Sequence, residues 1–591
     1  MCRIFGSVEP APGREVLDAM EPPLRAGGPD HYGLYLDDGA AIGHRRLSVI
    51  DLSERANQPM RFGDLVMSYN GEVYNYREIR RELEGEYTFT TQSDSEVVLK
   101  AFHKWGVEAA KRFRGMFAVA FWDRRRRSLT LIRDRAGVKP LYYARQGERF
   151  LFASELTAIA RHPGFTPRLD PAAAGLYFQL GFVPAPYGIY AGSRKVEPGG
   201  WLEYREGQVR TGRYWRVEEA DALPPLSGTE EELAEELEAL LRESFRYRMV
   251  ADVEVGIFLS GGVDSPLLAS LLSRDYDLRS YTIGFRDPAH NEADIAARVA
   301  RILGTRHTEY FFDLPDLLRI LPRMPQLYDE PFADASMLPT YLVAELAGRD
   351  LKVVLSADGA DELFWGYPSN FTGARRYARY RRMGWLRPLL AAVPHYKARR
   401  LSTLLGRDPM AYKLAERSRF LPGEFRTPPG ALALPKCTER YEECAFRFDF
   451  RYFLTDDVLV KVDRSTMAHS LEAREPFLDH RIVEFARRLP AAFKYRDGET
   501  KYLLRRLLAK HLPEEIVRLP KRGFTVPLKR WLRDELRDEV METVRGTPVL
   551  AELLPGVASV TETFYRTGRR TRELWLLYLF ALWHRHHLEG R

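Results

Sequence analysis

The second residue of the chain, Cys2, is the first that could do covalent chemistry. Removal of Met1 would leave a thiol and an α-amine on this one residue. The α-amine has an ordinary pKa of about 7.7 to 8.0, so it could take the thiol proton, much as an N-terminal threonine uses its own amine. A lone cysteine is usually inert, so this assignment depends on the residues that accompany it.

Three short segments accompany Cys2 within the first hundred residues. They are residues 44–51 (HRRLSVID), 69–75 (YNGEVYN) and 93–96 (SDSE). Together, in this order and spacing, they resemble the substrate-contact segments of class II glutamine amidotransferases, which use an N-terminal nucleophile. The resemblance implies that the chain hydrolyses glutamine at Cys2.

The resemblance implies a role for each matched residue. The Asn70 side-chain amide and the Gly71 backbone N–H would donate hydrogen bonds to the oxyanion of glutamine hydrolysis. Arg46 would bind the glutamine α-carboxylate, which a guanidinium group contacts through two hydrogen bonds. Glu72 and Asp94 would hold the α-ammonium. The implied glutamine-binding residues are Arg46, Leu47, Ser48, Val49, Ile50, Asn70, Gly71, Glu72 and Asp94.

The chain departs from that family in two places near the nucleophile. The family usually begins with Cys-Gly, whereas Arg3 follows Cys2 here. The family also carries Arg-Gly-Pro-Asp shortly afterwards, whereas residues 27–30 read Gly-Gly-Pro-Asp. Neither departure removes a matched catalytic group.

A second chemical motif, residues 260–265 (SGGVDS), lies between an apolar run and a helical stretch. Backbone N–H groups at such a strand–turn–helix junction bind phosphate oxygens. The motif lacks the Gly-Lys-Ser/Thr ending of a kinase-type phosphate loop, so transfer of a γ-phosphate is disfavoured. It resembles instead the pyrophosphate-binding loop of ATP pyrophosphatases, which cleave ATP between the α and β phosphates.

Residues 355–363 (LSADGADEL) follow another predicted strand. Because the carboxyl ends of parallel strands meet at one edge of a sheet, Asp264 and Asp361 could share a Mg²⁺ ion that bridges ATP phosphates. The sequence therefore predicts one nucleotide site built from both loops.

The two halves together resemble the glutamine-dependent asparagine synthetase family, and the resemblance continues through residues 461–472, 476–480, 499–501 and 520–524. It implies ATP and Mg²⁺ as the substrate and cofactor. The implied ATP-binding residues are Leu259, Ser260, Gly261, Gly262, Asp264, Ser265, Ile283, Ser356 and Ala357; the metal ligands are Asp264 and Asp361. Besides Cys2, Asn70 and Gly71, the implied catalytic residues are Asp358, near the acceptor, and Lys521, which would neutralise charge on the phosphates.

The implied reaction joins both halves. A carboxylate attacks the α-phosphate of ATP, giving an acyl-adenylate and pyrophosphate, and ammonia from Cys2 then displaces AMP. We expect aspartate as the acceptor; the alternative is another carboxylate, such as a sugar acid, a peptide or a pathway intermediate. Trp365 and Glu475, which differ from the family's usual glycine and apolar residue, could reshape the acceptor pocket or be packing. A non-catalytic scaffold or bare glutaminase is disfavoured because Cys2, Asp264 and Asp361 are all present.

The spacing of apolar runs predicts the elements that position these residues. Short β-like runs at 65–69, 117–122, 128–132, 141–144 and 150–153 predict an α+β sandwich, with antiparallel sheets between helices, over residues 2–215. A proline-containing linker is expected at 216–228. Residues 229–591 then predict an α/β nucleotide-binding domain with a parallel sheet, opened by a capping box at Thr229 and Glu232, and a helical part from about residue 371.

Composition bounds the remaining expectations. The 591 residues are 45% hydrophobic with a net charge of +7, which indicates a globular protein and gives no sign of a nucleic-acid partner. Three cysteines exclude a disulfide framework, and the spacing of Cys437 and Cys444 favours two thiols over a metal site. With no apolar run of membrane-spanning length, we expect a cytoplasmic protein without a membrane partner, and the family suggests a homodimer.

Residues 375–382 alternate arginine with tyrosine. A helix whose tyrosines pack inward explains this pattern at least as well as binding to single-stranded nucleic acid.

Overall fold

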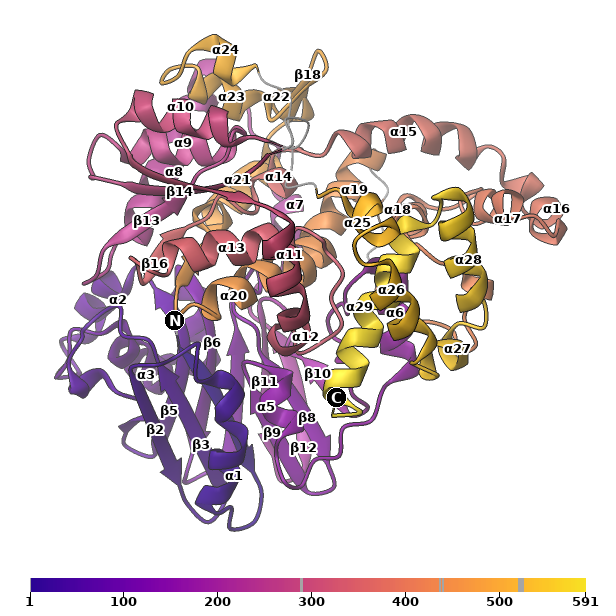
Figure 1. The fold of residues 1–591 in the computed structure, drawn as a ribbon. Coiled ribbons are helices and arrows are strands. Elements are labelled where there is room, and N and C mark those ends of the chain that lie inside the picture. The colour runs from indigo at the N-terminus through magenta and orange to yellow at the C-terminus, as the bar shows by residue number, and fades with distance from the viewer. Residues whose placement is uncertain (1, 287–290, 435–436, 438–439, 519–525, 591) are drawn as a thin grey trace.

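Two antiparallel sheets form the N-terminal half of the molecule (Figure 1). The computed structural model describes residues 2–286, 291–434, 437, 440–518 and 526–590. One sheet has the order β10 (Ser193–Lys195), β8 (Tyr142–Gln146), β9 (Arg149–Ala153), β1 (Arg3–Val8), β3 (Ala40–Arg46), β2 (His31–Leu36). The other has the order β12 (Gln208–Arg213), β11 (Gly200–Arg205), β7 (Ser128–Arg133), β6 (Gly115–Asp123), β5 (Leu65–Val73), β4 (Met60–Phe62).

Alternating side chains explain why the two sheets pack face to face. Every second residue of a strand points to the same face, and Ile4, Ile42, Val66, Leu131 and Phe152, from strands of both sheets, form one buried cluster. Helices α1 (Arg14–Met20) and α5 (Leu156–Ala160) contact strands of the first sheet, and α3 (Asp94–Trp105) contacts the second. The predicted sandwich of antiparallel sheets between helices is therefore confirmed.

The linker region begins with one short helix. Helix α7 (Val217–Asp221) follows β12, and α8 (Glu230–Arg248) begins after an irregular stretch. The predicted capping box is present, because the Thr229 hydroxyl accepts a hydrogen bond from the Glu232 N–H at 3.2 Å and the Glu232 carboxylate accepts one from the Thr229 N–H at 2.8 Å. This box fixes the first turn of α8.

A five-stranded parallel sheet forms the core of the second half. Its order is β15 (Arg306–Phe312), β14 (Arg279–Phe285), β13 (Val255–Phe258), β16 (Val353–Leu355), β17 (Glu472–Arg474). The chain moves outward from β13 first on one side and then on the other, so the loops after β13 and β16 leave a crevice between them. Strand β17 was not predicted, because it is three residues long and two of them are charged.

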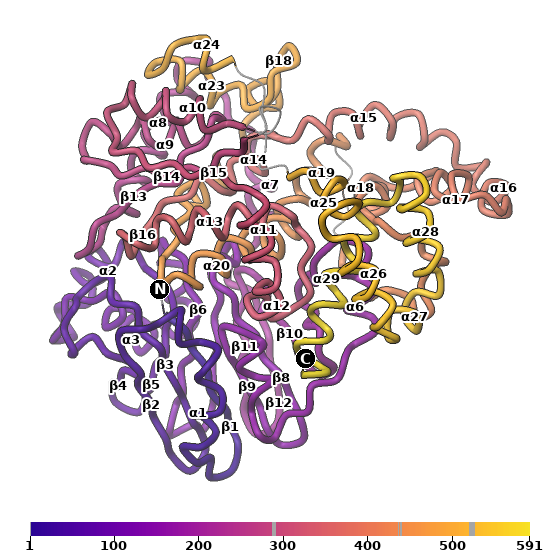
Figure 2. The backbone as a smooth tube through the Cα atoms, viewed as in Figure 1, coloured from indigo at the N-terminus to yellow at the C-terminus, as the bar shows by residue number. Residues whose placement is uncertain are grey.

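Helices flank this sheet and make up most of the remainder of the chain, which also holds the short antiparallel pair β18 (Tyr495–Arg496) and β19 (Glu499–Thr500). Helices α9 (Asp264–Leu272), α10 (Ala293–Leu303) and α13 (Met337–Ala347) connect its strands. A helical part runs from α15 (Pro368–Arg381) to α29 (Thr571–His587), which confirms the predicted helical C-terminal part. Figure 2 shows the N-terminal end of the chain beside α20 (Leu459–Met467), although the two are far apart in the sequence.

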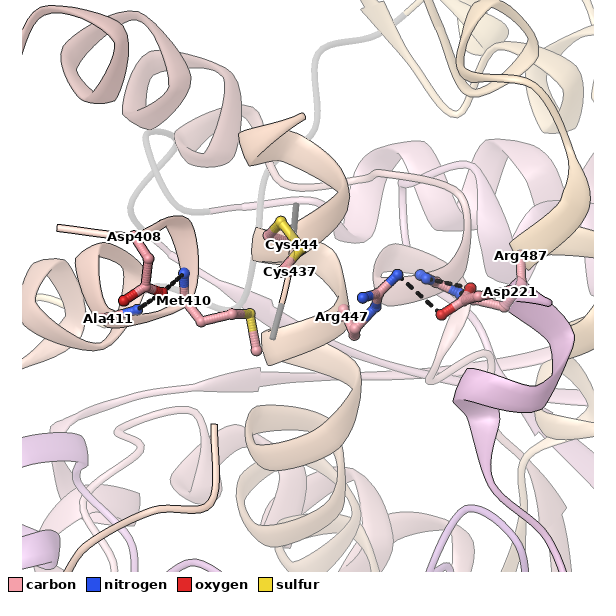
Figure 3. Close-up of a disulfide and its surroundings, with 8 residues drawn as sticks. All are labelled: Asp221, Asp408, Met410, Ala411, Cys437, Cys444, Arg447 and Arg487. Carbon is pink, nitrogen blue, oxygen red and sulfur yellow. Dashed lines mark hydrogen bonds and ion pairs between the residues drawn. A yellow bond between two sulfur atoms is a disulfide. The ribbon is translucent and has the colours of Figure 1, made fainter. Parts of the chain in front are cut away.

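The expectation that Cys437 and Cys444 are two free thiols was wrong. The structure joins them by a disulfide, with their Cα atoms 5.9 Å apart (Figure 3). Cys444 lies on α19 (Tyr441–Phe448), and Cys437 is joined to it there, with both side chains buried. A spacing of seven residues does not by itself indicate this pairing, because a disulfide requires the two Cα atoms to come within about 7 Å of each other.

Buried ion pairs join the two halves of the molecule. Arg3 of β1 contacts Asp463 of α20 at 3.0 Å and Glu155 at 2.7 Å. Arg464 contacts Asp463 at 2.8 Å and Asp329 at 3.0 Å. Although burial disfavours the charged form, Arg3 and Arg464 hold the pKa of Asp463 at about 2. Arg3, where the family usually has glycine, therefore fixes the strand of the predicted nucleophile to the second half.

Replacing Asp463 tests how much this contact stabilises the fold. Asp463→Asn would leave two buried guanidinium groups without the carboxylate they share, and we expect a loss of about 3 to 5 kcal/mol. Urea unfolding followed by circular dichroism measures it. The exposed pair of Arg127 and Asp38 provides the control, because Asp38→Asn should change stability by less than about 1 kcal/mol. Equal effects of the two substitutions would contradict a stabilising role for the interface.

Candidate active sites

The predicted nucleophile, Cys2, immediately precedes β1 and is partly buried. Its Sγ lies 3.9 Å from the Leu47 carbonyl oxygen. Burial raises the pKa of the Cys2 thiol to about 11, although the Arg46 charge and the Leu47 contact act in the opposite direction. The thiol therefore stays protonated at neutral pH unless a base removes its proton. Met1, whose removal would expose the α-amine, lies outside the described residues.

The predicted oxyanion donors lie on β5. Asn70 is fully buried, and neither atom of its side-chain amide has a hydrogen-bond partner among the residues that the structure describes. A buried polar group without a partner is costly, so the amide is available to a bound molecule. Gly71 is required by its neighbours, since a Cβ there would lie 2.1 Å from the Met116 carbonyl oxygen. The assignment of both residues to the oxyanion remains a prediction.

Arg46 holds the segment that follows it. Its NH1 donates to the Ser53 carbonyl oxygen at 2.9 Å and to Asn57 Oδ1 at 2.8 Å, and its NH2 contacts the Ile50 and Asp51 carbonyl oxygens. Residues Leu47, Ser48, Val49 and Ile50 form the start of this loop. A glutamine carboxylate that binds Arg46 would have to share its guanidinium group with these loop carbonyls or displace them from it.

The two carboxylates predicted to hold an ammonium are buried together. Asp94 accepts hydrogen bonds from the Tyr69 hydroxyl at 2.7 Å and the Val73 N–H at 2.9 Å. Burial and the Asp94 charge raise the pKa of Glu72. An arriving ammonium group would favour ionisation of both carboxylates.

Sequence reasoning assigned no role to β17, which reaches this site from the second half. Arg474 lies 3.6 Å from the Glu72 carboxylate and 2.6 Å from Glu472, and it is fully buried. The resemblance covers residues up to 472 and from 476 onward, so Arg474 falls between two quoted segments. Its sheet register with β16 is what directs it toward the first half.

A cavity of about 390 Å³ lies at the carboxyl ends of β13 and β16. Most of the predicted nucleotide-site residues line it: Leu259, Ser260, Gly262, Asp264, Ser265, Ser356, Ala357, Asp358 and Asp361. Gly261 and Ile283 are not among its lining residues, because Gly261 packs against Ile295 and Ile283 is buried in the core. Lys521 lies outside the described residues. Thus the two loops that the sequence singled out do meet.

The loop after β13 is held in the form of a phosphate-binding turn. The Ser260 N–H donates to Ser265 Oγ at 2.8 Å, and the Gly262 N–H donates to Ser260 Oγ at 3.3 Å. Helix α9 then begins at Asp264, so its N-terminal partial positive charge faces the cavity. This arrangement suits an anionic ligand.

Lys501 joins the two predicted metal ligands. Its Nζ contacts the Asp264 carboxylate and lies 2.6 Å from Asp361 Oδ1. Burial disfavours the ammonium, but these carboxylates raise the pKa of Lys501 above its ordinary value. One cation thus reaches both carboxylates, and carboxylate oxygens are the hard donors that Mg²⁺ prefers. The sequence comparison included Lys501 in a matched segment without giving it a role.

A second, larger cavity of about 860 Å³ adjoins the nucleotide cavity. Asp334, Ser336 and Phe453 line both. Its wall is rich in cationic side chains, namely Arg417, Arg419, Lys529, Arg530, Arg533 and Arg572. Burial lowers the pKa of Arg419 to about 10, and the charges of Arg572 and Arg417 act in the same direction. Asp334, Asp457 and Asp534 also line the cavity, so its wall carries charges of both signs with an excess of cationic side chains.

The two unusual residues near the predicted acceptor site lie outside both cavities. Trp365 is buried and stacks on Phe446, with 5.4 Å between the ring centroids. Its φ of 61° lies in the left-handed region, where the family's usual glycine is favoured. Glu475 is buried, which raises its pKa to about 7. Neither side chain reshapes the cavities directly.

The pH dependence of glutamine hydrolysis tests which group activates Cys2. If the α-amine takes the thiol proton, kcat/KM should rise with pH through about 8 and then level off. A pH–rate profile from about pH 6 to 11 measures this. A rise that continues toward pH 11 would show that the thiol loses its proton without the amine.

A metal-dependent stability measurement tests the shared cation position. Lys501→Ala removes the ammonium that Asp264 and Asp361 contact, and we expect a loss of about 3 to 5 kcal/mol that added Mg²⁺ partly restores. Thermal unfolding with and without MgCl₂ checks it. Lys510→Ala, which removes an exposed ion pair with Glu238, is the control. An equal Mg²⁺ effect on the wild type and on Lys501→Ala would contradict a shared position.

Comparison with known proteins places these sites in a family. The asparagine synthase family model matches residues 236–585, and the glutamine amidotransferase domain model matches residues 1–215. A "Putative asparagine synthetase [glutamine-hydrolyzing]" from Mycobacterium tuberculosis is 34% identical over 95% of this chain and 92% of its own length. "Asparagine synthetase [glutamine-hydrolyzing] 1" from Bacillus subtilis is 31% identical over 98% and 94%. "Amidase chry2" from Gibberella zeae is 27% identical over 88% and 86%.

The two matched models cover both halves in the order in which the sites occur. Relatives above 30% identity extend over nearly the whole chain, so the match is not confined to one domain. The chain therefore belongs to the family of glutamine-hydrolysing asparagine synthetases, which are carbon–nitrogen ligases.

Proposed function

We propose that the chain is a glutamine-dependent amide synthetase that consumes ATP and converts aspartate to asparagine. The observation that carries the proposal is the meeting of the loops after β13 and β16 at one cavity, with Lys501 between Asp264 and Asp361. Residues 2–215 form the glutamine half in this proposal, residues 216–228 the linker, and residues 229–591 the synthetase half. A cytoplasmic location fits the supply of ATP and glutamine.

In the glutamine half, the Cys2 sulfur attacks the amide carbon of glutamine and its proton passes to the Cys2 α-amine. Asn70 and Gly71 donate hydrogen bonds to the oxyanion that forms. The carbon–nitrogen bond then breaks and ammonia leaves with a proton from the amine. Water hydrolyses the remaining thioester, which releases glutamate and restores the thiol.

In the synthetase half, an oxygen of the acceptor carboxylate attacks the α-phosphorus of ATP, and pyrophosphate leaves. The N–H groups of the loop before α9 hold the phosphates, and the Lys501 ammonium stabilises the negative charge that develops. Asp264 and Asp361 would hold Mg²⁺, which neutralises phosphate charge when bound. Ammonia then attacks the acyl carbon, AMP leaves with the electrons of the carbon–oxygen bond, and the nitrogen loses a proton. Asp358 faces the acceptor, and Lys521 is assigned to the phosphates.

Isotope labelling tests both halves together. The protein is incubated with amide-¹⁵N glutamine, Mg-ATP and aspartate, and the products are identified by mass spectrometry. We expect ¹⁵N-asparagine, AMP and pyrophosphate in equal amounts. Absence of AMP and pyrophosphate with aspartate and with every other carboxylate tested would refute the synthetase assignment.

Two variants separate the half-reactions. Cys2→Ala should lower glutamine-driven amide formation by about a thousandfold or more while free ammonia still supports it. Asp361→Asn should lower amide formation from both nitrogen sources, because it acts on ATP. If Cys2→Ala also abolished the ammonia-driven reaction, the assignment of Cys2 to glutamine alone would be wrong.

A second candidate function is the same reaction on a larger acidic carboxylate. The observation that favours it is the cavity of about 860 Å³ with an arginine-rich wall, which adjoins the nucleotide cavity at Asp334 and Ser336. Aspartate alone would leave most of this space unfilled. A carboxylate that carries a second anionic group, such as a phosphorylated sugar acid, matches both the volume and the charge.

Steady-state kinetics distinguishes the two acceptors. If the larger acid is the substrate, its kcat/KM should exceed that of aspartate, and Arg419→Gln should raise its KM at least about tenfold, through loss of a charged contact. The KM for ATP is the control and should not change. Turnover of aspartate alone, unaffected by Arg419→Gln, would reject the larger acceptor.

A further inference from the structure

One region of the surface has a composition unlike the rest of the chain. Residues 374–407, which we call the arm, contain ten lysine or arginine residues and no aspartate or glutamate. The arm thus carries a formal charge of +10, larger than the +7 of the whole chain. Its cationic residues are Arg375, Arg376, Arg379, Arg381, Arg382, Arg387, Lys397, Arg399, Arg400 and Arg407.

The arm consists of short helices at the edge of the molecule. It includes the end of α15, the 3₁₀ turn Gly384–Leu386, α16 (Arg387–Ala392) and α17 (Tyr396–Ser402). Figure 1 shows α15 leaving the body of the molecule, with α16 and α17 at its right-hand edge. Helices α16 and α17 pack on each other. The segment 391–397 is exposed at every position, and its one cation–π contact among the described residues is that of Arg570, 5.0 Å from the centre of the Tyr396 ring.

Large apolar side chains are exposed in the same place. Trp385 is 71% exposed, Leu389 62%, Val393 40% and Tyr396 41%. These four lie within twelve residues, whereas the other large apolar side chains with comparable exposure, such as Leu52 and Leu318, are scattered. A group of exposed tryptophan, tyrosine and aliphatic side chains next to cationic ones is typical of a surface that lies in a membrane interface.

The cationic side chains of the arm are largely available to an outside partner. Among the described residues, Arg376 is the only one of the ten that forms an ion pair, at 2.7 Å from Glu416. Arg400 and Arg407 donate to backbone carbonyls, of Glu416 and Thr403. The others make no ion pair within the described chain, so phosphate groups of anionic lipids can contact them.

Other partners fit these features less well. The arm's tyrosines are not a stacking surface for bases, because Tyr377 is buried with Tyr412 and Tyr441 and Tyr380 packs against them. A second copy docked through the same surface would bring +10 against +10. Leu389 and Val393 would gain little from a nucleic acid, whereas an acyl-chain boundary removes them from water.

We propose that the arm docks the protein on an anionic membrane surface, with Trp385, Leu389, Val393 and Tyr396 inserted at the interface and the arginines on lipid phosphates. Among the described residues, no helix combines the length and apolarity needed to cross a bilayer, so the contact is peripheral. The docking differs from the expectation that no membrane takes part. It does not depend on the proposed amide chemistry.

The fold links the docked surface to the cavities. Tyr367, which lines the nucleotide cavity, immediately precedes α15, and Arg417 and Arg419, which line the larger cavity, follow the arm. The chain segments on either side of the arm therefore contribute to the walls of the two cavities.

Vesicle flotation of the full-length protein tests the proposal. Vesicles of phosphatidylcholine alone are compared with vesicles in which phosphatidylglycerol replaces part of it. We expect binding to the anionic vesicles only, with weakening at high salt. Arg379→Glu/Arg382→Glu/Lys397→Glu and Trp385→Ser/Leu389→Ser should each lower the affinity at least about tenfold. Circular dichroism without vesicles verifies that the variants are folded.

Control variants make one substitution of each kind elsewhere on the surface. Arg125→Glu alters the exposed basic turn between β6 and β7, and Leu318→Ser removes an exposed leucine far from the arm in sequence; neither should change vesicle binding. Trp385→Phe should retain binding while losing the fluorescence quenching caused by lipids brominated on their acyl chains.

The opposite results would overturn the proposal. They are absence of wild-type flotation with anionic vesicles, equal flotation of the wild type and the charge-reversal variant, or unchanged quenching in Trp385→Phe. Binding of a single-stranded oligonucleotide in place of vesicles would assign the arm to nucleic acid, and loss of a dimer in the arm variants without vesicle binding would assign it to a second copy.

Discussion

The buried charge network between the two halves is the constraint on which the rest of the structure depends. Arg3, Asp329, Asp463 and Arg464 lie in contact at positions almost closed to water, and Glu155, which is 13% exposed, contacts Arg3. Removing such charges from water costs several kcal/mol per ion, and only close pairing offsets that cost. The halves can therefore meet in few orientations. Since Asp463 lies on α20, whose Lys461 and Val462 line the nucleotide cavity, this contact ties the strand after Cys2 to the wall of the second site.

The short strand β17 extends this connection. It adds the fifth strand to the parallel sheet, and its Arg474 reaches the Glu72 carboxylate of the first half. Glu472, on the same strand, also acts on the pKa of the Cys2 thiol. Residues of the second half thus contribute to the electrostatic surroundings of Cys2 and Glu72, which are predicted to form the glutamine site.

Two of the departures from the family pattern have physical explanations in this chain. Arg3 replaces a glycine but finds two buried carboxylates, and Trp365 adopts the backbone conformation that favours glycine while stacking on Phe446. Glu475 is a buried carboxyl whose pKa is raised to about 7. The arm also departs from the average composition of the chain, because it has no acidic residue. The result is a cationic, partly apolar surface at the edge of the molecule.

Local sequence determined the parts of the protein that depend on neighbouring residues. Short β-like runs bounded by turn residues predicted β5 to β9, because strand-forming side chains and turn residues are local features of a sequence. The Thr229 and Glu232 pair predicted the start of α8, and residues 260–265 predicted a strand–turn–helix junction, because hydrogen bonds within a few residues define the cap and the turn. The resemblance identified the family from the same short motifs. The position of Lys501 between Asp264 and Asp361, the reach of Arg474 to Glu72, the pairing of Cys437 with Cys444 and the strand β17 were decided by the tertiary structure. Each of these depends on how separate segments pack against one another, and nothing in the local spacing of residues fixes that packing.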